Sequence, residues 1–149
     1  MDAVGLRFRE ATFDVILCNN VLPCASDDRA ILAEIRRCLK PDGVAMVDVD
    51  VQIARTTPAT HLHLRDPDRF TVAYVATNGP QRFYGRDYPD RLRAAGLTPL
   101  RFDPLRGLGT PFRRAQGLKA DGRVYLAFAT PAAAATFARA VRAQTSESS

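Results

Sequence analysis

The sequence predicts an α/β fold built around a parallel sheet, and three features of residues 13–51 support this prediction. Phe13–Cys18 is a short apolar run rich in β-branched residues, a pattern typical of a strand buried on both faces. An amphipathic helix follows it, and Val44–Val51 is a second apolar run. A strand, a helix and another strand form a β-α-β crossover, so we expect the two strands to be parallel.

Start and stop signals frame the helix between these strands. Ser26 offers a hydroxyl as a cap, and Asp27-Asp28 place negative charge in the first turn, near the positive end of the helix dipole. The apolar stripe recurs at helical spacing, at Ile31, Leu32, Ile35 and Leu39. Pro41 prevents the helix from continuing past Lys40, and Asp42-Gly43 turns the chain into the second strand.

Two further elements have local signals in the second half of the chain. Asp87 is a candidate cap for a helix whose apolar face is formed by Tyr88, Leu92 and Ala95, and Gly96 is its expected end. Leu97–Phe102 and Arg123–Thr130 are expected strands. Thr130-Pro131 is expected to cap a last helix over residues 132–143.

Length and composition indicate a single globular domain. The chain has 149 residues, of which 46% are hydrophobic and 25% are charged. We expect one domain over residues 1–143 and a disordered tail over residues 144–149. No apolar run approaches the roughly 20 residues that a membrane span needs, and MDAVGLRFRE has no signal-peptide core. These features predict a cytoplasmic protein without a membrane partner.

The net charge of +5 comes mostly from scattered arginines. No block of like charge and no aromatic-interleaved motif accompanies them, so we interpret them as a solvated surface and do not expect nucleic acid as a partner. Cys18, Cys24 and Cys38 are expected to be reduced thiols, two of them buried, because their spacing fits no zinc pattern. His61 and His63 have no third ligand at a suitable spacing, so no metal site is predicted.

Three segments of the β-α-β unit carry a family resemblance. FDVILCNNVL, DDRAILAEIRRCLKPDG and VAMVDV resemble the fourth strand, following helix and fifth strand of class I S-adenosylmethionine-dependent methyltransferases, especially the type 11 group. They cover about a quarter of the chain. The run R-x-YGRDY-x-D-x-L-x-x-AGL, residues 82–97, resembles the family segment that begins the helix before the sixth strand. Asp2-Ala3-x-x-Leu6-x-Phe8 is similar to the family segment that precedes the fourth strand.

The resemblance implies a partial Rossmann-like methyltransferase sheet with flanking helices. The strands would correspond to family strands 4-5-7-6, with the last two forming an antiparallel hairpin at the sheet edge. No G-x-G-x-x-G run precedes Phe13, so the glycine-rich N-terminal half of the fold is missing from this sequence.

The implied cofactor is S-adenosyl-L-methionine. In the family, the Asp-Ala pair lies against the adenine, which makes Asp2 and Ala3 cofactor-contact candidates. The end of the first strand, Cys18, Asn19 and Asn20, matches a cofactor-contact edge, and the amides can make directional hydrogen bonds. The alternative is that Asn19 and Asn20 only end a strand and satisfy backbone groups.

Substrate contacts have weaker signals. Asp50 emerges at the carboxyl end of the second strand, and Tyr84 and Arg86 lie in the second family-like run. Structural roles are the alternative to substrate contact. Asp50 would then pair with an arginine, and Tyr84 and Arg86 would pack at the start of the helix. No catalytic residue is identified. The region after Val51 is the expected determinant of specificity.

The resemblance predicts a methyltransferase acting on an unknown, small-molecule acceptor. The alternative is a non-catalytic, methyltransferase-like module that associates with itself or with a partner chain through its open sheet edge, because an exposed apolar edge strand is adhesive.

Overall fold

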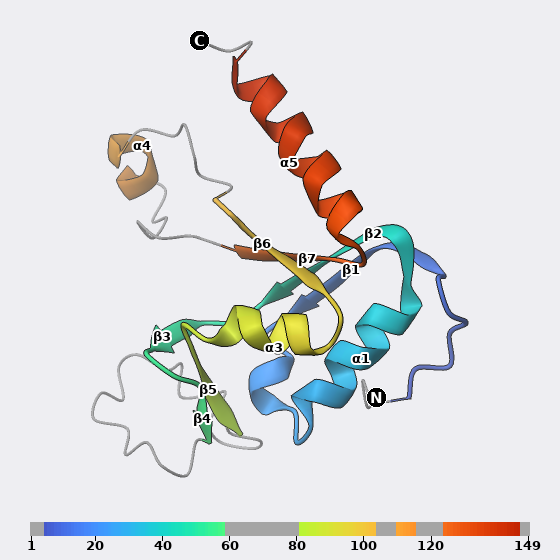
Figure 1. Cartoon of the computed structure of the whole chain (residues 1–149). Coiled ribbons are helices and arrows are strands. Elements are labelled where there is room, and N and C mark those ends of the chain that lie inside the picture. The colour runs from blue at the N-terminus through green and yellow to red at the C-terminus, as the bar shows by residue number, and fades with distance from the viewer. Residues whose placement is uncertain (1–4, 59–80, 104–109, 116–123, 147–149) are drawn as a thin grey trace.

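The main sheet has four strands in the order β1-β2-β7-β6 (Figure 1). The structure is a computed structural model that describes residues 5–58, 81–103, 110–115 and 124–146. β1 (Phe13–Asn19) and β2 (Leu39–Asp48) are parallel, whereas β7 (Val124–Phe128) is antiparallel to β2 and to β6 (Thr98–Phe102). The expected parallel pair, the strand order and the terminal hairpin are therefore confirmed.

A second, three-stranded sheet lies beyond the carboxyl end of β2. Its order is β3-β5-β4, with β3 at Val51–Ile53, β5 at Arg82–Gly85 and β4 at Thr57–Pro58. The sequence did not predict this sheet. Gly85 is required at its position, because a Cβ atom there would collide with the backbone of Arg55.

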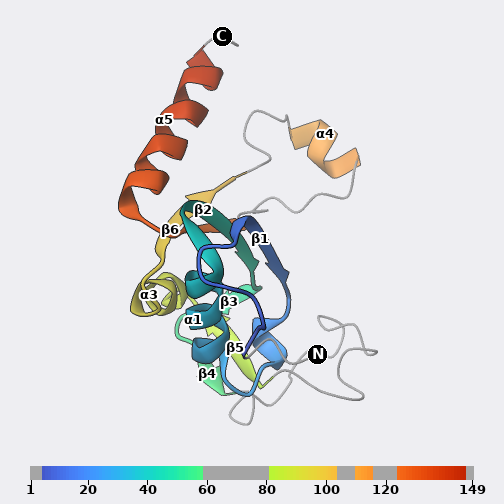
Figure 2. The ribbon, with the colours of Figure 1, turned by 90° about the vertical axis from the view of Figure 1, so that its right-hand side faces the viewer.

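The helices cover the two faces of the main sheet unequally. The 3-10 turn η1 (Leu22–Cys24), α1 (Asp28–Cys38) and α3 (Tyr88–Ala94) lie on one side in Figure 1. α5 (Pro131–Ser146) packs on the opposite face by its first turns and then projects away from the sheet, as Figure 2 shows. α4 (Thr110–Ala115) is a short separate helix. α5 extends beyond the end expected at Ala143, and residues 147–149 lie outside the described part.

The face under α1 and α3, here called the closed face, holds the main core. Leu22, Leu32, Val47, Tyr88 and Leu92 are fully buried there. The predicted stripes of α1 and α3 both supply this core, so their helical spacing is confirmed. Arg36 of α1 also donates from Nε to the carbonyl of Gly96, which links the two helices at 3.2 Å.

The other side of the sheet, here called the open face, is only partly covered. Phe137 and the alanines of α5 pack on Phe128 and on nearby side chains of β2 and β6. Val15 and Leu17 of β1 point to this face and remain 58% and 69% exposed. The expectation that Phe13–Cys18 is buried on both faces is wrong, because β1 is the outermost strand of its sheet and α5 packs at the other side (Figure 2).

Three local details differ from the sequence predictions. Asp27, not Ser26, caps α1, since its carboxylate accepts from the backbone N–H groups of Arg29 and Ala30, both at 3.0 Å. The strand β2 begins at Leu39, so the LKPDG segment is extended rather than the end of a helix and a turn. Residues 49 and 50 separate β2 from β3, whereas one continuous strand was expected over Val44–Val51.

The other capping predictions had mixed outcomes. Gly96 has a φ of +77°, in the left-handed region that suits glycine, and follows α3 as expected. Thr130 Oγ1 accepts from the backbone N–H of Ala133 at 3.2 Å and so caps α5. Asp87 precedes α3 but does not cap it with its side chain, because that carboxylate accepts from Thr56 instead.

Polar contacts attach the chain before β1 to α1. Arg37 donates to the carbonyls of Leu6 and Phe8 at 3.0 and 2.8 Å, and Glu34 accepts from the backbone N–H of Leu6 at 3.0 Å. Arg37 and Glu34 also pair with each other at 2.8 Å. The segment that carries the Asp-Ala resemblance therefore continues into a region held against the carboxyl half of α1.

Candidate functional site

The carboxyl ends of β1 and β2 lie side by side, as the parallel register requires. Asn19 pairs with Asp48, and the backbone N–H of Asn20 donates to the Asp48 carbonyl at 3.1 Å. Alternation along β1 places the Asn19 side chain on the open face, where it is exposed. Asn20 has a φ of +54°, an unusual left-handed conformation that asparagine tolerates better than most residues. The two amides therefore lie at the strand end where ligands bind in open α/β sheets.

The other cofactor candidates have different positions. Cys18 is buried on the closed face, where burial raises the pKa of its thiol. Its side chain therefore does not share the open face with Asn19. Asp2 and Ala3 lie outside the described residues. As expected, all three cysteines are free thiols, and Cys18 and Cys38 are buried.

Two carboxylates lie at the end of β2, Asp48 as its last residue and Asp50 just beyond it. Burial raises the pKa of Asp48, and the nearby charge of Asp50 raises it further. Asp50 is exposed just beyond the strand. Since Asp48 is the residue that pairs with Asn19, this edge of the sheet places amide groups beside a carboxylate that holds its proton more strongly than usual.

Tyr84 and Arg86, the candidates from the second family-like run, have opposite environments. Tyr84 is 1% exposed and donates its hydroxyl to Asp28 Oδ2 at 2.8 Å. Burial and this hydrogen bond raise its pKa. Arg86 has an exposed side chain, and its backbone N–H donates to the carbonyls of Ile53 and Ala54.

Asp28 is the centre of a buried ionic cluster that the sequence analysis did not identify. Arg91 Nη1 lies 3.1 and 2.8 Å from its two carboxylate oxygens, and Arg82 Nη1 lies 3.2 Å from Oδ1. Arg82 also donates to the carbonyls of Ala25 and Ser26, both at 3.0 Å. The cluster thus joins α1, α3 and β5 and holds the loop that leads from the end of β1 to α1.

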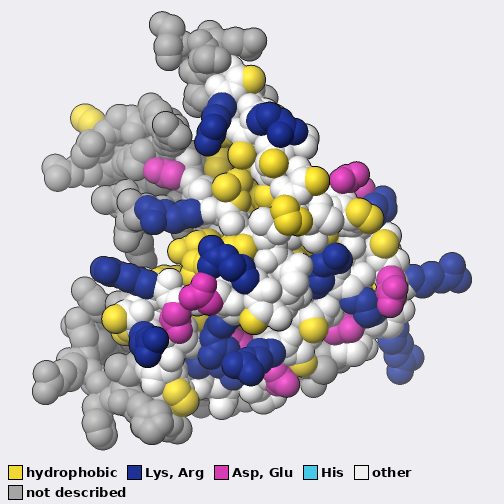
Figure 3. Space-filling view, in the orientation of Figure 1, with side chains coloured by type: hydrophobic (Ala, Val, Ile, Leu, Met, Phe, Trp, Pro, Cys, Tyr) yellow, Lys and Arg dark blue, Asp and Glu magenta, His cyan; other side chains and the backbone are white. Residues whose placement is uncertain are grey.

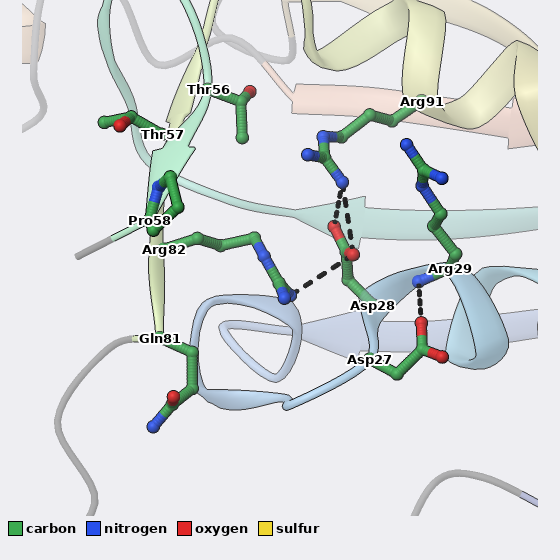
Figure 4. Close-up of a pocket in the computed structure, with 9 residues that line it drawn as sticks. All are labelled: Asp27, Asp28, Arg29, Thr56, Thr57, Pro58, Gln81, Arg82 and Arg91. Carbon is green, nitrogen blue, oxygen red and sulfur yellow. Dashed lines mark hydrogen bonds and ion pairs between the residues drawn. The ribbon is translucent and has the colours of Figure 1, made fainter. Parts of the chain in front are cut away.

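A cavity of about 310 Å³ opens beside this cluster (Figure 4). Its lining comes from the start of α1 (residues 27–29), from residues 56–58, from the start of β5 (residues 81 and 82) and from Arg91 of α3. Figure 4 shows the guanidinium groups of Arg91 and Arg82 converging on Asp28 from different elements. Of the predicted site residues that the structure describes, none lines this cavity, but the hydroxyl of Tyr84 donates to Asp28, which does line it.

The signals for this cluster were present but ambiguous. Asp28 is an acidic residue in the first turn of α1, where its charge interacts favourably with the helix dipole. That position alone does not indicate that the carboxylate also pairs with arginines. Its partners lie 54 and 63 residues further along the chain, at Arg82 and Arg91, among many other arginines. Figure 3 shows that Lys and Arg side chains are interspersed with Asp and Glu over the visible face, so charge alone does not distinguish these two.

Within residues 5–58, 81–103, 110–115 and 124–146, no group of three or more His, Cys, Asp or Glu side chains could hold a metal ion. His61 and His63 lie outside these ranges. None of the helices in the same ranges has the length and apolar character needed to cross a membrane.

Comparisons with known proteins concern the sequence and the fold of the chain. A family model for a methyltransferase domain, type 11, matches residues 1–47. No curated protein matches the chain. The fold is similar to a protein described as a methyltransferase, solved in complex with the Haloferax volcanii Trm112 methyltransferase activator. That match has a TM-score of 0.55 and 17% identity, and covers 87% of this chain and 59% of the other.

A second solved structure is the Burkholderia thailandensis 1,6-didemethyltoxoflavin-N1-methyltransferase with bound 1,6-didemethyltoxoflavin and S-adenosylhomocysteine. It has a TM-score of 0.50 and 21% identity, and the match covers 84% of this chain and 46% of that one. This chain therefore spans roughly half the length of the two solved proteins. Over residues 1–47 it matches the type 11 methyltransferase domain, and its sheet has the fold of class I S-adenosylmethionine-dependent methyltransferases.

Proposed function

We propose that this chain takes part in the transfer of a methyl group from S-adenosylmethionine to a small-molecule acceptor. The observation that supports this proposal most directly is the family match over residues 1–47, which contains β1, α1 and most of β2. These are the elements whose carboxyl ends bring Asn19 next to Asp48.

Asn19 and Asn20 fit a role in holding the amino-acid part of the cofactor. Both side chains are exposed, and an amide can donate to a carboxylate and accept from an ammonium group. The side chain of Cys18 does not fit this role, because it is buried on the closed face. Asp2 and Ala3 stay proposed adenine contacts on the resemblance alone.

When bound, the cofactor supplies an electrophilic methyl group on a sulfonium. Asn19 and Asn20 would hold the amino-acid part of the cofactor, whose carbon–sulfur bond would then be available for in-line displacement by an acceptor. The chain's contribution is to place the acceptor in line with that bond and to keep the acceptor oriented. We assign no catalytic base.

The substrate candidates differ in how they would contribute. Asp50 and Arg86 are exposed and are proposed to contact the acceptor. The hydroxyl of Tyr84 is engaged by Asp28, so Tyr84 is proposed to act through that carboxylate by positioning the start of α1.

Calorimetric titration of the chain with S-adenosylmethionine tests the proposal. We expect saturable binding with a dissociation constant of about micromolar order, and about tenfold weaker binding by Asn19→Ala. Asp42→Ala is the matched control, because Asp42 is an exposed polar residue near the amino end of β2. Absence of saturable binding, or equal affinities for the two variants, would contradict the proposed cofactor site.

A second candidate function is association through β1. Val15 and Leu17 are exposed apolar residues on a strand at the sheet edge, which favours contact with another chain. Light scattering over a range of protein concentrations tests this. We expect Leu17→Lys to reduce the average mass of any oligomer, whereas Phe112→Lys, which changes a 52% exposed residue of α4, should leave it unchanged. A monomer at all concentrations would exclude self-association.

A further inference from the structure

The Asp28 cluster carries more positive charge than negative charge in a poorly solvated place. The side chains of Arg82, Asp28 and Arg91 are 15%, 4% and 25% exposed. One carboxylate forms direct ion pairs with two guanidinium groups, which gives these three residues a formal excess of one positive charge, and Asp87 acts on Arg91 only through its charge at longer range. An excess charge with little access to water is costly, and an anion beside it would reduce that cost.

The cavity beside the cluster has the same charge balance. Its lining includes three arginines and two aspartates, again a formal excess of one positive charge. Arg29 and Asp27 offset each other at the start of α1, so the excess belongs to the buried cluster. A volume of about 310 Å³ is at the lower end of the range for small-molecule sites.

Arg91 is the residue with donors left for a ligand. Arg82 already forms an ion pair with Asp28 and donates to backbone carbonyls of the loop before α1. Within the described residues, the hydrogen bonds of Arg91 all come from Nη1, which leaves Nε and Nη2 for another acceptor. Thr57 and Gln81 also line the cavity.

We propose that this cavity binds the carboxylate group of a small molecule, with Arg91 as its main contact. A monoanion matches the single excess charge, whereas a dianion would exceed it. The cavity lies among segments that follow the carboxyl ends of β1 and β2, which is the edge of the sheet where Asn19 also lies, although Asn19 is on the open face. The inference rests on the proposed function and deepens it, because it names a carboxylate-bearing acceptor as the substrate class.

Nuclear magnetic resonance titration of the full chain tests this inference with acetate as the probe and acetamide as its neutral counterpart, at constant ionic strength. We expect acetate, but not acetamide, to shift the Nε–Hε resonance of Arg91 with a dissociation constant of roughly millimolar order. Arg91→Gln should weaken acetate binding by about tenfold or more, and Arg91→Lys by less, since it keeps the charge but loses the planar fork.

Arg93→Gln is the matched control. Arg93 lies on the same helix but pairs with Asp90 at the surface and does not line the cavity. We expect it to bind acetate like the unmodified chain. No shift of the Arg91 resonance by acetate, or equal effects of Arg91→Gln and Arg93→Gln, would overturn the inference. Tighter binding of inorganic phosphate than of acetate would overturn the choice of a carboxylate.

The cofactor also carries a carboxylate, and a competition experiment separates the two sources. If the cavity serves the acceptor, S-adenosylmethionine will not displace acetate, and Arg91→Gln will not weaken cofactor binding. Displacement would assign the cavity to the cofactor and overturn the acceptor assignment. Cofactor binding without acetate binding would reject this inference alone. Acetate binding without cofactor binding would reject the proposed function and the acceptor assignment with it, but would leave the carboxylate site in place.

Discussion

Helices cover the two faces of the main sheet to different extents. On the closed face, α1 and α3 cover Ala45 and Val47 of β2 and Ala127 of β7, which are fully buried. On the open face, α5 covers Phe128 and its neighbours but leaves Leu17 of β1 69% exposed. The difference shows that an apolar strand residue contributes to stability only where another element covers it.

The same contrast separates the two candidate ligand regions. Asn19 belongs to the open face, while the Asp28 cluster lies beside helices of the closed face. Exposed amides can be rearranged by a ligand at little cost. The ionic cluster is held by several elements and can offer a fixed arrangement of charge.

The largest expected difference in the free energy of unfolding is between a leucine that covers the closed face and a leucine on the open face. Leu32→Ala removes a fully buried side chain and should lower the free energy of unfolding by about 3 kcal/mol, because it leaves a cavity. Leu17→Ala should change it by less than about 0.5 kcal/mol, since Leu17 is largely in water already. Urea denaturation of both variants measures the contrast. Similar losses would mean that the open face is covered in solution.

A smaller effect is expected where coverage is partial. Phe137 packs against Phe128 with ring centroids 5.3 Å apart and against Phe102 at 5.9 Å, but its side chain is only half-buried. Phe137→Ala should lower the free energy of unfolding by about 1–2 kcal/mol, less than for a buried phenylalanine. Thr136→Ala, at an exposed neighbouring position, is the control in the same denaturation experiment. An effect as large as that of Leu32→Ala would show that α5 is as essential as α1.

The smallest expected effect is the pH dependence of stability that comes from two aspartates at opposite ends of the parallel strands β1 and β2. The folded pKa of Asp48 lies above its ordinary value of 3.8, so the folded state binds the proton more strongly and loses stability as pH rises through that window. Asp48→Asn should therefore be more stable than the unmodified chain at pH 7, with the difference disappearing at about pH 3.

Asp14 should behave in the opposite way. Its hydrogen bond from Lys40, at 2.8 Å, lowers its pKa, so its contribution is present above the unfolded pKa and is lost as pH falls. Asp14→Asn should thus be slightly less stable at pH 7. Denaturant unfolding at both pH values checks the signs, and the same sign for both variants would contradict the assigned causes.

Local patterns predicted the β-α-β unit because their signals do not depend on distant residues. The apolar spacing of Ile31, Leu32 and Ile35 predicts a helix face, and the runs on either side predict strands. Short strands such as β4 and β5 have too few residues for a period, so they were missed. Asp87 has the type and position of a cap, but Thr56, far away in sequence, engages its carboxylate.

The candidate site divides in the same way. The ends of strands can be predicted from the sequence, so Asn19, Asn20 and Asp50 could be named as candidate site residues from the sequence alone. The pairing of Asp28 with Arg91 spans 63 residues and depends on how α3 packs against α1. No spacing rule selects those two residues among 21 basic and 16 acidic side chains.

The sequence by itself determined the periodic elements, the crossover between β1 and β2 and the likeness to methyltransferases, because each depends on residues close together in the chain. The tertiary structure decided which face of β1 is covered, which carboxylate is buried and where the cavity opens. Those properties depend on contacts between distant segments, whose energies no local pattern records.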